Sequence, residues 1–139
     1  MATCEERVGG SLERTLEDLR TLWALYCEDS EASDEDLGNI YEYGLSFDYV
    51  GPDTFKDQER GYFRYQLSYG GPSDEFRFYA EPYKWGWRPY CIEYWFLDWF
   101  DGAHRELRGE DKEFMKEIFS WFDDCGTTQN LFEKAMEDY

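Results

Sequence analysis

The sequence predicts an α+β fold: a four-stranded antiparallel sheet with helices packed on one face, in the order α-β-β-β-β-α-α. Apolar residues recur at helical spacing near both ends of the chain, and they alternate with polar residues in the middle. Short links between the alternating runs favour antiparallel pairing. The amphipathic helices must then bury their apolar stripes against one face of the sheet.

Composition indicates a compact core beneath a strongly negative surface. The 139 residues include 32 acidic and 14 basic side chains, which gives a net charge of −18, and 21% of the residues are aromatic. Disordered acidic segments contain few aromatics. We therefore expect a single domain, residues 1–139, which can bury about two-thirds of its unfolded surface.

The first helix is predicted from Ser11 to Cys27, and the first ten residues are expected to fray. Ser11 follows two glycines and is a suitable N-cap. The apolar stripe consists of Leu12, Leu16, Leu19, Leu22, Trp23 and Tyr26. Residues 28–36 read EDSEASDED, with six acids in nine positions, and this composition predicts a solvated acidic loop.

Four strands are predicted in the middle of the chain. Aromatic residues alternate with polar ones in Tyr41–Val50, Tyr62–Tyr69 and Glu75–Tyr79. The turn Gly70–Ser73 makes a hairpin of the second and third strands. The fourth strand, Cys91–Phe100, is apolar at nearly every position, so we expect it in the interior of the sheet with both faces at least partly covered.

An irregular connection and two helices complete the predicted order. Residues 81–89, EPYKWGWRP, contain two prolines and a glycine and are expected to display Trp85 and Trp87. The alternative is that both tryptophans cap the edge of the aromatic core. A helix is predicted over Glu110–Phe122, and Thr127 or Thr128 caps a last short helix.

The residue patterns predict no metal site and no cofactor. A calcium loop counted from Asp29 would need glycine at its sixth position and glutamate at its twelfth. Those positions hold Asp34 and Ile40. No phosphate-binding glycine loop is present either.

Catalytic patterns are also weak, and we expect a non-enzymatic protein. The single histidine, His104, falls in the charged stretch DGAHRELRG, which predicts a solvated loop residue. No nucleophile elbow accompanies it. Glu93 and Asp98 could in principle form a glycosidase pair, but that chemistry depends on a separation the sequence does not specify.

Cysteine usage and the N-terminus predict a cytoplasmic protein with reduced thiols. The cysteines are far apart and form no Cys-x-x-Cys pair; they are Cys4, Cys27, Cys91 and Cys125. The N-terminal segment lacks the apolar run of a signal peptide, and no stretch approaches the roughly 20 apolar residues of a membrane span.

The charge predicts a basic protein partner. A negative surface repels nucleic acid and anionic membranes and attracts basic proteins. Carboxylates one helical turn apart stand about 5.4 Å from each other, so rows of them approximate a phosphate array. The predicted contact surface is the acidic loop and the outer face of the 110–122 helix, with a tryptophan as anchor. Its residues are Glu28, Asp29, Glu31, Asp34, Glu35, Asp36, Glu110, Asp111, Glu113, Glu117, Trp85 and Trp87.

In charge, length and absence of catalytic motifs, the chain resembles the small acidic DNA-mimic inhibitors of phages and mobile elements, the anti-CRISPR and anti-restriction class. The stretch GYFRYQLSYGGPSDEFRFY, residues 61–79, also resembles a hairpin of uncharacterised phage and plasmid proteins, which implies no activity. The resemblance implies an inhibitor of a CRISPR effector, a restriction enzyme or another nuclease.

Three other interpretations remain open at this point. An immunity protein or antitoxin that neutralises a basic nuclease toxin would need the same surface. An acidic hydrolase or a carbohydrate-binding module could use Trp85 and Trp87 with paired carboxylates. Adaptation to a saline cytoplasm would account for the charge alone.

Overall fold

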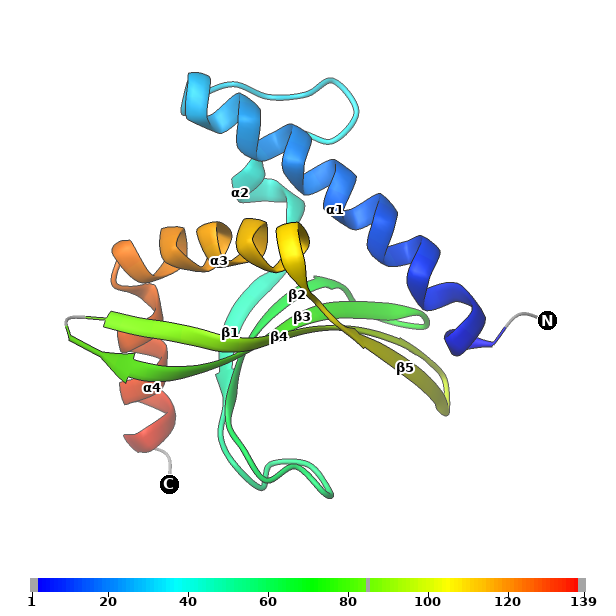
Figure 1. Cartoon of the computed structure of the whole chain (residues 1–139), viewed down its shortest axis with the longest axis vertical. Helices are drawn as coiled ribbons and strands as arrows, with labels where there is room; N and C mark the ends of the chain where they lie inside the picture. Colours follow the sequence, from blue (N-terminus) through cyan, green and yellow to red (C-terminus); the bar gives the residue numbers. More distant parts are fainter. Residues whose placement is uncertain (1–2, 85, 138–139) are drawn as a thin grey trace.

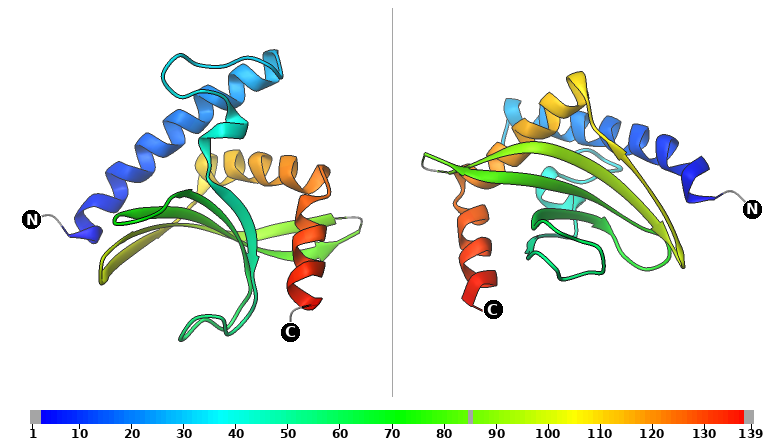
Figure 2. Two further views of the ribbon diagram at one scale, coloured as in Figure 1. Left: turned by 180° about the vertical axis from the view of Figure 1, so that it is seen from behind. Right: turned by 60° about the horizontal axis from the view of Figure 1, so that its bottom comes forward.

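A computed structural model describes residues 3–84 and 86–137 (Figures 1 and 2). The elements are α1 (Cys4–Glu28), α2 (Ile40–Tyr43), β1 (Ser46–Val50), β2 (Tyr62–Ser68), β3 (Ser73–Tyr83), β4 (Gly86–Asp98), β5 (Asp101–Glu106), α3 (Gly109–Asp124) and α4 (Thr127–Glu137). The strands form one antiparallel sheet in the order β1-β2-β3-β4-β5. The α+β class is confirmed, but the sheet has five strands where four were predicted.

Helices α1, α3 and α4 pack against one face of the sheet, and the core lies between these two layers (Figure 1). Its fully buried side chains come from both layers and include Phe63, Phe76, Phe78, Ile92, Tyr94, Leu19, Leu22, Met115, Ile118 and Phe119. Large aromatics bury about 150–250 Å² each. This burial offsets the self-repulsion of a chain with a net charge of −18.

Helix α1 begins seven residues earlier than predicted, at Cys4. The Thr3 side chain caps it, and the Asp101 carboxylate accepts a hydrogen bond from the backbone N–H of Cys4 at 2.8 Å. Ser11, predicted as the N-cap, is buried inside the helix with its hydroxyl 2.6 Å from that of Tyr94. The prediction of a frayed start was wrong because contacts with β5 and its turn order the first helical turns.

The predicted strand Tyr41–Val50 is divided between a helical turn and a shorter strand. The Asn39 side chain accepts a hydrogen bond from the backbone N–H of Glu42 and caps α2. Only residues from Ser46 onward pair with β2. The alternation of aromatic residues before Ser46 therefore did not mark a strand, because a local cap satisfies the backbone there.

Within the described part of 81–89, the predicted irregular connection is β-structure interrupted by a turn at Lys84 and a bulge beside Pro89. Strand β3 continues to Tyr83 and β4 starts at Gly86, so the two strands form one long hairpin; Trp85 lies outside the described residues. The register shifts beside Pro89, which is opposite Ala80 while Cys91 is opposite Tyr79. A bulge is one of the few places where a sheet accommodates proline. The prolines and the glycine of this segment therefore do not interrupt the hairpin, although their presence in the sequence predicts an irregular connection.

Strand β5 was predicted as a loop. It pairs with β4 from Glu93↔Glu106 to Asp98↔Asp101, and it forms one edge of the sheet. Ala103 is its single buried side chain. Charged side chains are typical of edge strands, where they discourage pairing with other chains. Because they stand in place of an apolar alternation, the sequence did not predict this strand.

The remaining predicted elements are confirmed in outline. β2 and β3 form the expected hairpin, and α3 and α4 lie close to their predicted ranges. The Thr128 hydroxyl donates to Asp123 at 2.5 Å and so ties the start of α4 to α3. Strand β4 is interior, but helices cover only one of its faces. Across the described ranges, no helix is long and apolar enough to cross a membrane.

The contact between Asp101 and the start of α1 predicts a pH-dependent contribution to stability. The hydrogen bond from the backbone N–H of Cys4 lowers the pKa of Asp101 below its ordinary value of 3.8. A carboxyl group with a lowered folded-state pKa stabilises the fold above its unfolded pKa, and this contribution is lost as pH falls through the folded value. Asp101→Asn keeps an acceptor but removes the charge.

We therefore expect a lower urea midpoint for Asp101→Asn than for the wild type at neutral pH, and equal midpoints once the pH falls well below 3.8. Urea unfolding followed by tryptophan fluorescence across this range measures the difference. A difference that is independent of pH would contradict the assignment.

Candidate functional site

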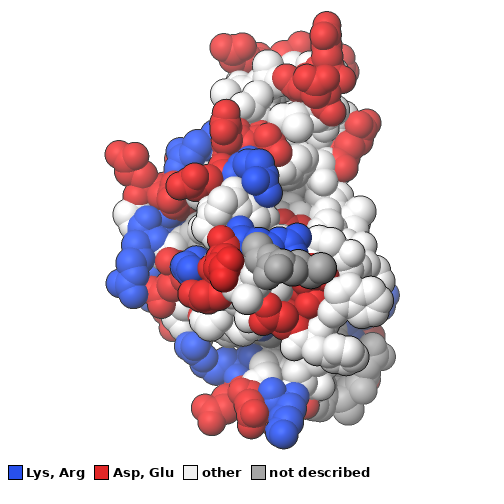
Figure 3. Space-filling view, turned by 90° about the vertical axis from the view of Figure 1, so that its right-hand side faces the viewer, with Lys and Arg blue, Asp and Glu red and all other residues white. Residues whose placement is uncertain are grey.

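The most acidic part of the molecule is a segment that contains no lysine or arginine. Between Arg20 and Lys56 the chain carries nine acidic residues and no basic one. This segment comprises the end of α1, the loop that follows, α2 and β1. Figure 3 shows acidic side chains alone at the top of the molecule, where α1 ends and the loop begins, and interspersed charges lower down. The molecule therefore has one purely acidic end.

The acidic loop is ordered by two of its own carboxylates. Asp34 accepts hydrogen bonds from the backbone N–H groups of Asp36 and Leu37, and Asp29 accepts one from Glu31. A short backbone bridge between Asp34 and Gly38 closes the loop. Five of the six predicted contact residues of the loop are exposed: Glu28, Asp29, Glu31, Glu35 and Asp36. The loop therefore presents carboxylates on a defined backbone.

The predicted carboxylates of α3 line a groove beside α1. Glu110, Glu113 and Glu117 share this groove with Arg20 and Phe114. Asp111 forms an exposed ion pair with Arg20 at 2.9 Å, and Glu113 forms one with Lys116 at 3.3 Å. Arg20 and Lys116 are two cations against the four carboxylates of Glu110, Asp111, Glu113 and Glu117, so the groove remains acidic overall.

An aromatic cluster lies where α1, α2 and α3 meet. Its rings are those of Trp23, Tyr26, Tyr41 and Trp121, with centroids 5.3 Å to 5.9 Å apart in the contacting pairs. Tyr41 is 59% exposed. Trp23 donates from its indole Nε1 to Glu117 at 3.2 Å, which joins the cluster to the acidic groove. The sequence analysis did not predict this cluster, because it assigns Trp23 and Tyr26 to the apolar stripe of a helix and Tyr41 to a strand, and gives Trp121 no role.

Trp87 is part of the edge of the core and is not displayed. Its ring centroid lies 5.1 Å from that of Phe63 and 4.8 Å from that of Phe132. Its Nε1 donates to Gln129 at 2.9 Å. We therefore replace Trp87 as the expected anchor with the cluster around Tyr41; Trp85 lies outside the described residues.

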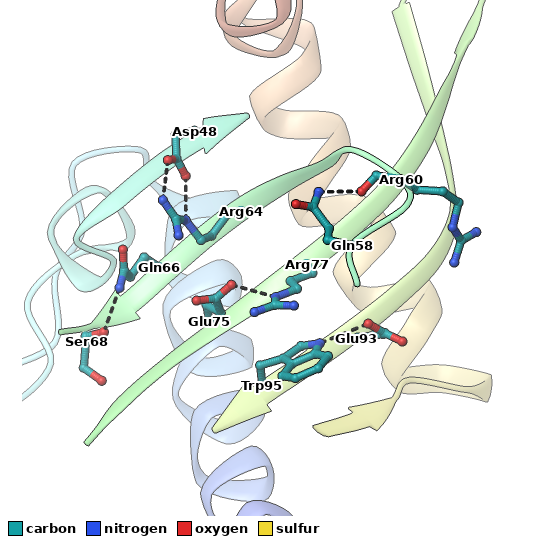
Figure 4. Close-up of polar contacts among 10 residues, drawn as sticks. All are labelled: Asp48, Gln58, Arg60, Arg64, Gln66, Ser68, Glu75, Arg77, Glu93 and Trp95. Atoms are coloured by element: carbon teal, nitrogen blue, oxygen red, sulfur yellow. Dashed lines mark hydrogen bonds and ion pairs between the residues drawn. The ribbon is translucent and has the colours of Figure 1, made fainter. Parts of the chain in front are cut away.

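The sheet face without helices carries its own network of ion pairs (Figure 4). Arg64 binds Asp48 through two hydrogen bonds of 2.7 Å and 3.0 Å, and this contact raises the pKa of Arg64. Arg77 binds Glu75 at 2.8 Å, with side chains 15% and 4% exposed. Charges on this face are therefore largely matched, and the acidic excess lies elsewhere.

Aromatic rings hold the Arg77 guanidinium in place. Its central carbon lies 4.7 Å from the ring centroid of Tyr62 and 3.9 Å from that of Trp95. Burial raises the pKa of the neighbouring Tyr79 to about 12, so this tyrosine is neutral at physiological pH. Arg64 and Arg77 thus each have an acidic partner on this face.

His104 and the carboxylate pair occupy positions that differ from those expected. His104 lies in β5, where its ring stacks on Trp95 with a 4.2 Å centroid distance and Nε2 lies 3.9 Å from Glu93. His104 is exposed as predicted, but it lies in a strand and not in a loop. Side chains alternate along a strand, so Glu93 and Asp98 point to opposite faces, and Asp98 pairs with Arg7 of α1 at 2.7 Å. These two carboxylates cannot flank one glycosidic bond.

Comparisons with family models, with curated proteins and with solved structures find no match. Among the residues that the structure describes, no group of three or more His, Cys, Asp or Glu side chains could hold a metal ion. All four cysteines are free thiols. The site must therefore be interpreted from its own geometry.

The buried ion pair on the open face predicts a stability test. Arg77→Met leaves the Glu75 carboxylate buried without a cation, and we expect a loss of about 3 kcal/mol or more. Arg64→Met is the matched control: it breaks the more exposed pair with Asp48, and we expect about 1 kcal/mol or less. Urea unfolding at neutral pH gives both values, and equal losses would contradict the distinction.

Proposed function

We propose that the protein is a non-enzymatic inhibitor that occupies the nucleic-acid-binding surface of a basic protein of host defence or nucleic-acid processing. The observation that carries this proposal is the acidic end free of lysine and arginine, together with the α3 carboxylates and the aromatic cluster between them. We refer to the 28–36 loop, the α3 carboxylates and the cluster as the acidic surface.

The spacing of the carboxylates suits a partner that normally binds phosphates. Glu113 and Glu117 are separated by about 6 Å along the axis of α3, and successive phosphates of one DNA strand advance about 3.4 Å along the duplex axis. Carboxylates of the ordered loop add charge from a second element. The carboxylate interval therefore approximates that of every second phosphate, about 6.8 Å, so lysine and arginine side chains arranged for a phosphate backbone can meet carboxylates at such intervals.

The carboxylates and the aromatic cluster of the acidic surface would contribute to binding in different ways. The charge accelerates encounter with a basic partner, and salt screens this effect. Tight complexes also need buried anchors, which are most often Trp, Tyr and Arg. Tyr41 is exposed and Trp121 supports it from α3 with a 5.3 Å centroid distance. An exposed aromatic anchor beside the acidic groove thus combines both requirements.

The acidic surface predicts the outcome of a charge-reversal experiment. In one variant Glu31, Glu35, Glu110 and Glu113 are replaced by lysine. In a matched control Glu59, Asp124, Glu133 and Glu137, all exposed and elsewhere, are replaced by lysine, so both variants have the same net charge. We expect the first variant to lose at least about tenfold in inhibitory potency and the control to lose much less, because contact charges act at short range.

Potency is measured as inhibition of DNA cleavage by a restriction endonuclease, a CRISPR effector nuclease and a basic nuclease toxin, at low and at high ionic strength. Inhibition of the toxin alone would assign the protein to the immunity class. Equal losses in the two variants would show that only total charge matters, and inhibition of none of the three would contradict the proposal.

A further inference from the structure

Three aromatic side chains are exposed together at the end of the sheet farthest from the acidic surface. Tyr69 is 83% exposed, Trp99 86% and Phe100 fully exposed. Tyr69 follows β2, and Trp99 and Phe100 link β4 to β5. In an antiparallel meander the β2–β3 and β4–β5 turns lie at the same end, near the start of α1 (Figure 1). We call these three residues the aromatic tip.

The β4–β5 turn is held firmly and carries backbone strain. Its flanking residues are fixed to α1: Asp98 pairs with Arg7 at 2.7 Å, and Asp101 accepts from the backbone N–H of Cys4 at 2.8 Å. Trp99 has a φ of +56°. Two-residue hairpin turns normally place Gly, Asn or Asp in this left-handed conformation. A tryptophan in this conformation carries backbone strain, and such strain points to a role for its side chain.

A hollow of about 420 Å³ lies beside the tip and is lined by Gly70, Gly71, Ser73, Leu97 and Trp99. A Cβ atom added to Gly71 would stand 3.6 Å from the indole Nε1 of Trp99. The two glycines therefore keep side chains out of the hollow, and Leu97 contributes an apolar wall. The fully exposed Phe100 is next to Trp99 in the same turn, so a projecting ring and a recess occur side by side.

We propose that the aromatic tip is a self-association surface through which two copies of the chain form a twofold-symmetric dimer. In a twofold interface the same patch is used by both subunits, and each element meets its complement on the other copy. A projecting ring beside a recess meets this requirement, because Phe100 of each copy enters the hollow of its partner.

Two ion pairs reduce the repulsion that a second copy meets at this end of a chain with a net charge of −18, although the Asp101 carboxylate, which accepts hydrogen bonds from the backbone N–H groups of Cys4 and Gly102, keeps its charge. Asp98 is paired with Arg7, and Glu5 is paired with Arg105 at 2.9 Å. The acidic loop lies beyond the other end of the 25-residue helix α1, about 37 Å away. That distance is several times the screening length of about 8 Å at physiological ionic strength. The acidic ends of the two copies therefore point apart.

The area of the tip predicts a weak dimer. Burial of three large aromatics from each copy removes about 900–1,500 Å² from water. This is at the low end for specific interfaces. The loss of translational, rotational and side-chain freedom on association offsets much of the free energy gained by burying these rings, so we expect a dissociation constant on the order of 10 μM. The inference does not depend on the proposed inhibitor function, because the tip and the acidic surface lie at opposite ends of α1.

Sedimentation velocity of the purified full chain across about 1–500 μM tests the proposal. We expect a monomer–dimer equilibrium that added salt strengthens, because salt screens the remaining repulsion. Binding of a basic partner by the acidic surface has the opposite salt dependence, which separates the two proposals. Monomer at every concentration and ionic strength would overturn the dimer, as would dissociation on addition of salt.

Two variants and a control locate the interface. Phe100→Ser removes the projecting ring, and we expect dimerisation to weaken at least about tenfold. Trp99→Gly relieves the positive φ, so we expect a higher urea midpoint together with weaker association. Phe55→Ser removes an exposed ring from the β1–β2 loop and should leave association unchanged. Equal weakening by the control would overturn the assignment to the tip.

Discussion

Burial of the aromatic layer between the sheet and α3 is the interaction on which the rest of this structure depends. Phe47 stacks on Phe122 with centroids 4.0 Å apart, and Phe119 lies 5.1 Å from Phe78 and 5.7 Å from Phe63. A chain with a net charge of −18 repels itself. Large rings bury enough surface to hold the two layers together, and so they permit an acidic excess at the surface.

Distribution of the few cations then decides which parts of the surface are acidic. Arg64 and Arg77 are used on the open face of the sheet, and Arg7 and Arg105 hold the N-terminal end of α1 to β4 and β5. The stretch between Arg20 and Lys56 has none. Arginines therefore pair with part of the acidic charge at one end of the molecule and are absent from the segment at the other end, where the proposed partner surface lies.

Helix α1 connects these two ends and explains why each can act separately. Its first residues fix the β4–β5 turn, while its last turn leads into the acidic loop. A dimer formed through the aromatic tip would present two acidic surfaces, which would raise the effective concentration of one surface once the other had bound. The two proposals are thus compatible, although each rests on its own observations.

The α+β class, the β2–β3 hairpin, helix α3 and the acidic loop were predictable from sequence, because periodicity and local composition are short-range properties. Tertiary contacts decided the rest. Asp101 and Tyr94 order the start of α1 from about 90 residues away in sequence, a bulge accommodates Pro89, and pairing with β4 makes a strand of the charged β5 segment. The partners of Trp87, His104 and Tyr41 come from other elements, so which aromatics are displayed could be known only from the fold.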